Sequence, residues 1–169
     1  SLRSPRVDRK AFLWMAVAGT LLFVGSALQQ YGLYYTKVAN ASFLTSLYVI
    51  FTPFLLWLGF GEKANRLQIL AAVLATAGSF LLSSTGSWEA RPGDILEILG
   101  AFFWGLHLVV IAKYAAEFPS IPFACGQFLL CGLLNFCVGF MVESPAAFAN
   151  GSLLGALLYR ALLSICLGY

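Results

Sequence analysis

Three side chains that could bind a ligand or move a proton share one stripe of a long apolar segment. Glu97, Trp104 and His107 lie within residues 95–114, which carry few other polar groups. At about 100° per residue, an α-helix places these three with Gly100 and Ile111 inside an arc of about 80°. An acid and an imidazole are poor neighbours for lipid, so we expect the stripe to face the interior of a helix bundle.

The chemistry of the stripe points to recognition of a small molecule. Glu97 is expected near the outer surface, where it would attract cationic groups, and His107 about 15 Å deeper at about 1.5 Å per residue. Trp104 would pack against a substrate in the room that Gly100 leaves. His107 would bond that substrate or relay a proton, because a free imidazole titrates near about pH 6.5. Packing roles for Trp104 and His107 remain open alternatives.

Other polar residues inside apolar segments are also candidates, because polar groups in a membrane are costly. Gln29 and Gln30 end the first apolar segment, and either cavity lining or interhelical bonding would explain them. Arg160 lies within the last apolar segment and needs a carboxylate, water or an anionic substrate group. Pro53 removes the backbone bond to the carbonyl of Val49, which predicts a kink that is either a static bend or a hinge.

The elements that carry these residues are predicted to be transmembrane helices. The chain is 60% hydrophobic and 10% charged, whereas an average soluble domain is about 25% charged. Each apolar run is close to the roughly 20 residues that a helix needs to cross a bilayer. The runs are residues 11–34, 41–60, 67–84, 95–114, 121–142 and 152–169. We therefore predict an all-α, polytopic transmembrane bundle with six spans, the last of them cut at Tyr169.

The charges between the runs predict an orientation. Seven basic residues fall on one side, and only Lys37 and Arg91 fall on the other, which is a clear positive-inside signal. The seven are Arg3, Arg6, Arg9, Lys10, Lys63, Arg66 and Lys113. The N-terminal loop and Lys63 are therefore expected in the cytoplasm, and Ser87 outside.

Several functional classes find no support in the residues. No basic stripe with interleaved aromatics exists, so no nucleic-acid partner is expected. Cys125, Cys131 and Cys137 are spaced by six residues, about 240° around a helix, so they cannot share a face as metal ligands. With one histidine and no Ser-His-Asp arrangement, we expect no enzyme, no metal and no cofactor.

Two short motifs resemble a known family. The first runs from Ala39 and Ala41-Ser42 through Pro53 to Gly61-Glu62, as a helix, a turn and a returning helix. The second is Gly100-Ala101 followed by Trp104-Gly105, close to the start of a helix. In order and spacing, both are similar to the EamA-like domain of the drug/metabolite transporter superfamily.

That resemblance implies two inverted repeats of five helices each. Residues 1–88 would be the last three helices of the first repeat, and residues 89–169 the beginning of the second. Two helices before Ser1 and most of three after Tyr169 would complete the bundle. The absence of an initial methionine and the apolar end of the sequence agree with that expectation.

The resemblance also implies a function. A secondary transporter would move small metabolites, amino acids or drugs by alternating access, in this case as an exporter. The expected setting is the plasma or inner membrane, with a small-molecule substrate, the lipid bilayer, a proton gradient and a second copy of the chain as partners. A non-transporting membrane subunit and a membrane-embedded enzyme are the alternatives.

Overall fold

The computed structural model describes residues 9–83, 89–142, 155 and 159. All of the elements that it assigns there are helices, which confirms the predicted fold class. They are α1 (Arg9–Gly32), α2 (Val38–Ser46), α3 (Tyr48–Phe60), α4 (Arg66–Ser83), α5 (Pro92–Tyr114), the short 3₁₀ helix η1 (Ala115–Glu117) and α6 (Ser120–Val142). The predicted sixth span, with Arg160, lies outside the described residues apart from positions 155 and 159.

The lengths of these helices fit a bilayer. Four stretches of the described chain are long and apolar enough to cross a membrane: Arg9–Gly32, Val38–Phe60, Pro92–Glu117 and Ser120–Val142. The helix Arg66–Leu82 is apolar but shorter. It still falls close to the lower limit of about 17 residues for a spanning helix. The chain is thus a multi-pass membrane protein.

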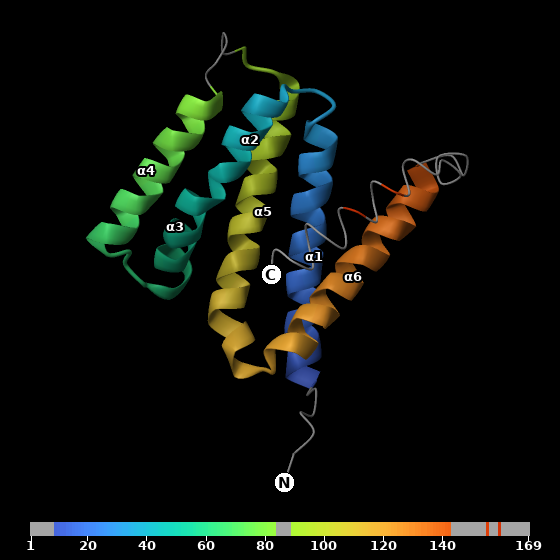
Figure 1. The fold of residues 1–169 in the computed structure, drawn as a ribbon. Coiled ribbons are helices and arrows are strands. Elements are labelled where there is room, and N and C mark those ends of the chain that lie inside the picture. The colour runs from blue at the N-terminus through green and yellow to red at the C-terminus, as the bar shows by residue number, and fades with distance from the viewer. Residues whose placement is uncertain (1–8, 84–88, 143–154, 156–158, 160–169) are drawn as a thin grey trace. The chain divides into compact units, whose positions relative to one another are not determined.

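Helix α5 is the element on which the first compact unit, Ser1–Leu134, is built. It packs against α1, α2 and α3, while α4 packs against α2 and α3 (Figure 1). Helices α1 and α5 run antiparallel, so that Gly32 meets Gly93 and Gly25 meets Gly100. A Cβ atom at Gly100 would lie only 3.2 Å from the carbonyl oxygen of Gly25. Small residues on both helices therefore bring the two backbones together, as is common in membranes.

The apolar core of this unit lies toward the other end of α1. It joins α1, α5 and the start of α6 through a cluster of buried side chains: Ala11, Met15, Ala18, Val110 and Phe123. Trp14 stacks on Tyr114 beside it, with ring centroids 3.5 Å apart. The second unit, Asn135–Tyr169, is described mainly at the end of α6, where Phe136 stacks on Phe140.

The second span is broken between α2 and α3, at a residue other than Pro53. Helix α2 ends at Ser46 and α3 begins at Tyr48, whereas Pro53 lies inside α3. At the break, the N–H of Leu47 bonds the carbonyl of Leu44 at 3.2 Å, which is a tighter turn than an α-helix makes. The Ser46 hydroxyl donates to the carbonyl of Phe43 at 2.6 Å. Such side-chain bonds compete with the helix, and this one lies beside a break that contains neither glycine nor proline.

The turn after α3 explains the Gly61-Glu62 pair. Gly61 adopts the left-handed conformation with φ 69° and closes the helix through a bond from its N–H to the carbonyl of Trp57. This conformation is costly for residues with a Cβ atom, and glycine adopts it freely. Glu62 then pairs with Lys113 of α5. The α3–α4 connection is thus attached to the end of α5.

Candidate functional site

A partly buried polar chain crosses three helices around Glu97. The Gln29 amide of α1 donates to the Thr45 hydroxyl of α2 at 3.0 Å, and Thr45 donates to Oε2 of Glu97 at 3.1 Å. Glu97 is fully buried, and its other oxygen, Oε1, has no hydrogen-bond partner among the described residues. Thr45 lies two residues before the break at Leu47. The network therefore adjoins a discontinuity in a spanning helix, a common setting for transporter binding sites.

Two features of the stripe differ from expectation. Glu97 does not reach an outer mouth in this structure, because α1 and α2 enclose its carboxyl group. The space beside Gly100 is also not free, since the backbone of α1 at Gly25 fills it. Both differences have one cause. Glycines spaced by seven residues on α1 and on α5 let these two helices approach closely, and a pattern on one helix does not show how close its neighbour comes.

Trp104 and His107 follow along the same face of α5, toward α1. A Cβ atom at Gly25 would lie 3.1 Å from Cδ1 of Trp104, so the indole packs on the α1 backbone. The indole N–H is buried without a partner among the described residues. His107 is buried, and its Nδ1 lies 3.1 Å from the Ala18 carbonyl. Since a carbonyl only accepts, this nitrogen carries the proton.

The remaining predicted site residues are not part of this face. Gln30 is exposed, although its neighbour Gln29 joins the partly buried network. Pro53 lies instead at a groove of about 480 Å³ between α3, α4 and α5, which Val49 and Thr52 also line. Gln127 of α6 is a further buried amide. Its Oε1 has no partner among the described residues.

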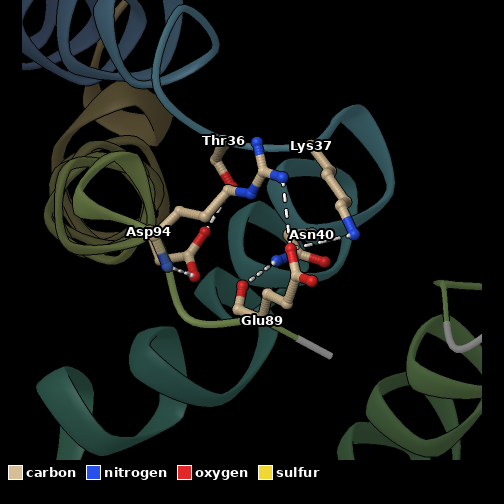
Figure 2. Close-up of polar contacts among 6 residues, drawn as sticks. Thr36, Lys37, Asn40, Glu89 and Asp94 are labelled. Carbon is tan, nitrogen blue, oxygen red and sulfur yellow. Dashed lines mark hydrogen bonds and ion pairs between the residues drawn. The ribbon is translucent and has the colours of Figure 1, made fainter. Parts of the chain in front are cut away.

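A second polar cluster joins the connections at the opposite end of α5 from Lys113 (Figure 2). Thr36 donates to Asp94, which also accepts the N–H of Arg91 at 2.9 Å as the cap of α5. Asn40 is 4% exposed and donates to the carbonyl of Glu89 at 3.3 Å. The cluster therefore holds the α1–α2 turn against the start of α5. No motif in the sequence marks Thr36 as the partner of Asp94.

Charge reinforces this second polar cluster. The carboxylate of Glu89 lies 3.2 Å from Arg91 and 3.4 Å from Lys37. The hydrogen bond from Arg91, together with the charge of Lys37, lowers the pKa of Glu89 below its usual value. A lowered folded-state pKa means that these pairs stabilise the fold above the unfolded value and lose that effect as pH falls through the lowered one. Because the side chains are exposed, salt screens the contribution.

No group of three or more His, Cys, Asp or Glu residues is placed to hold a metal ion within the described ranges. The α1–α5 face offers a carboxyl group, an indole N–H and an imidazole in apolar surroundings. Ion pairs or hydrogen bonds hold both ends of α5, through Lys113 at one end and Asp94 at the other.

Comparison with known proteins agrees with this description. The sequence profile of the EamA-like transporter family matches residues 2–84 and again 91–169. The chain is similar to an uncharacterized transporter of Archaeoglobus fulgidus, with 33% identity over 57% of this chain and 31% of that protein. It is also similar to the uncharacterized transporter YvbV of Bacillus subtilis, with 27% identity over 94% of this chain and 52% of that protein.

The chain therefore spans about a third to a half of the length of these two relatives. No solved structure matches it. The two matches of the family profile cover nearly all of the sequence, on either side of the connection between α4 and α5. The chain belongs to the EamA-like transporter family.

Proposed function

We propose that the intact protein is a secondary transporter that exports small metabolites, amino acids or drugs by alternating access. Family membership supports transport, and one observation supports a binding role for these helices in particular. Three buried polar atoms have no hydrogen-bond partner among the described residues: Oε1 of Glu97, Nε1 of Trp104 and Oε1 of Gln127. Buried polar groups are nearly always satisfied, so a ligand that supplies the partners is a natural explanation.

The chemistry of these atoms suggests the substrate class. An indole N–H would donate to a substrate oxygen, and an amide oxygen would accept from a substrate N–H. The surrounding helices are apolar, which favours a small molecule that is largely apolar with a few polar groups. No bond-breaking step is needed, and we propose that the protein is not an enzyme.

A transport assay tests this proposal directly. The intact protein in proteoliposomes would be offered a panel of amino acids and cationic drugs, with and without a proton gradient. We expect saturable flux of at least one compound, faster than the flux into protein-free liposomes. Liposomes that contain the same amount of denatured protein serve as a second control. Flux equal to the control for every compound would count against transport and favour a non-transporting subunit.

We also propose that the protein lies in the plasma or inner membrane with its N-terminal loop in the cytoplasm. Ser87 lies outside the described residues. The test therefore uses exposed positions near the two ends of the described helices. Cysteines introduced at Lys63 and Tyr34 of a cysteine-free protein would be probed on intact cells with an impermeant thiol reagent. We expect labelling at position 34 alone; labelling at position 63 alone would invert the topology.

Pro53 is proposed as a hinge of the second span during alternating access. Its missing N–H leaves the carbonyl of Val49 without its usual helical donor, beside the groove between α3, α4 and α5. Pro53→Ala should restore that bond and slow the conformational cycle, so the transport rate should fall while substrate affinity changes little. A variant that transports at the parental rate would mean that Pro53 is only a static feature of α3.

A further inference from the structure

Glu97 stands apart from the other described glutamates because of its surroundings. Its side chain is fully buried, while the described acids Glu62, Glu89 and Glu117 each pair with a basic residue at the surface. No Lys or Arg of the described chain contacts the carboxyl group of Glu97. An ionised carboxylate without a cation is the most costly group to bury, and such groups take up a proton instead.

The hydrogen bond from Thr45 decides which oxygen of Glu97 carries the proton in the acid form. By itself a donated bond stabilises the carboxylate, so burial without a cation is what favours the acid. Thr45 accepts the amide of Gln29, so its single proton points to Oε2 of Glu97. Oε2 is thus the carbonyl oxygen of the acid, and the acid proton falls on Oε1. That oxygen occupies the space where Gly32 lacks a side chain, since a Cβ atom there would lie 2.8 Å from it.

The other groups that face Glu97 do not supply a compensating charge. From α1 they are Gln29 and Gly32, and from α2 Thr45, all of them neutral. From α5 itself, Asp94 lies one turn earlier, and both of its oxygens accept hydrogen bonds, from Thr36 and from the N–H of Arg91. Asp94 therefore supplies no positive charge that would offset a carboxylate at Glu97.

We propose that Glu97 is a proton-binding site, and that the protonated form holds α1, α2 and α5 together in the conformation seen here. Loss of the proton leaves a carboxylate that must reach water. The contacts of Glu97 with Gly32 and Thr45 then open, next to the break at Leu47. A role of the Glu97 proton in driving transport rests on the function proposed above. The protonation of Glu97 does not depend on that function.

Infrared spectroscopy of the intact protein in lipid nanodiscs tests the protonation. At neutral pH the parent should show the carbonyl stretch of a buried carboxylic acid, and this band should be lost at high pH. Glu97→Gln, which keeps the shape of the protonated acid, should lack the band. Glu117→Gln, which removes an exposed acid paired with Lys10, should keep it and serves as the matched control. A parent without such a band at neutral pH overturns the proposal.

Hydrogen exchange tests the coupling to conformation without labels or substrate. After correction for intrinsic exchange, the amides of residues 38–51 should exchange about tenfold faster per pH unit between the pKa of Glu97 in the open form and its higher pKa in the closed form. Glu97→Gln should remove this dependence and stay protected. If exchange in Glu97→Gln still depends on pH, the proposal is overturned. It is also overturned if amide protection in the parent protein changes with sodium concentration and not with pH. The sodium experiment needs no variant, so it decides even if Glu97→Gln does not fold.

The outcomes for the two proposals are separable. A protein that shows the acid band and the pH-dependent exchange, yet moves no compound of the transport panel, refutes the proposed function and leaves the proton site in place. Flux of a substrate by a protein whose Glu97 is ionised at neutral pH does the reverse.

Discussion

Gly93→Ala should strongly destabilise the protein at the junction between the α1–α2 turn and the start of α5. The added Cβ atom would lie 2.8 Å from the carbonyl carbon of Tyr35 and 2.9 Å from the nitrogen of Thr36. These are backbone atoms, so no side chain can rotate to relieve the contact. Overpacking of this kind costs about 1–3 kcal/mol and occasionally more. The free energy of unfolding, measured in mixed detergent and SDS by tryptophan fluorescence, should fall by at least that amount.

A matched glycine separates this clash from helix propensity. Gly132 lies inside α6, and a Cβ atom there would meet nothing within 4 Å. Gly132→Ala should therefore leave stability unchanged or raise it by about 0.5–1 kcal/mol, because alanine favours a helix over glycine. If Gly93→Ala behaved like Gly132→Ala, the close approach of α1 and α5 described here would be wrong.

The sequence was sufficient to predict the elements because each depends on local composition. Long apolar runs between charged ends require helices in a bilayer, and the predicted boundaries of α1 and α5 differ from the observed ones by only a few residues. The direction in which the stripe of α5 faces was also predictable. Glu97 and His107 are both buried, as expected of polar groups that avoid lipid.

Contacts between helices could not be predicted in the same way. Thr45 and Gln29 carry no motif, yet they complete the surroundings of Glu97 from two other helices. Such pairings depend on the register of α1 and α2 against α5, and the glycines set only that of α1 through backbone contact. The break at Leu47 was missed for a related reason: a proline is a strong local signal, whereas competing hydroxyl bonds such as that of Ser46 are weak and common.

Two substitutions at Trp104 should separate packing from substrate recognition. Trp104→Ala removes an indole that packs on the α1 backbone at Gly25, and should lower the free energy of unfolding by about 3–5 kcal/mol. Trp104→Phe keeps a ring and removes only the buried N–H, which has no partner among the described residues. Stability should therefore be retained or slightly raised, since an unsatisfied buried donor costs about 1–3 kcal/mol.

Transport by Trp104→Phe then shows whether that N–H serves a substrate. A neutral hydrogen bond contributes about 0.5–1.5 kcal/mol, so the affinity for the transported compound should fall by about two- to tenfold while expression stays normal. Trp14→Phe is the matched control, because Trp14 stacks on Tyr114 at the other end of α1 and should leave affinity unchanged. His107→Ala belongs in the same series, as it removes the bond to the Ala18 carbonyl. Should Trp104→Phe and His107→Ala both keep the parental rate and affinity, the α1–α5 face serves packing alone, and the substrate site lies elsewhere.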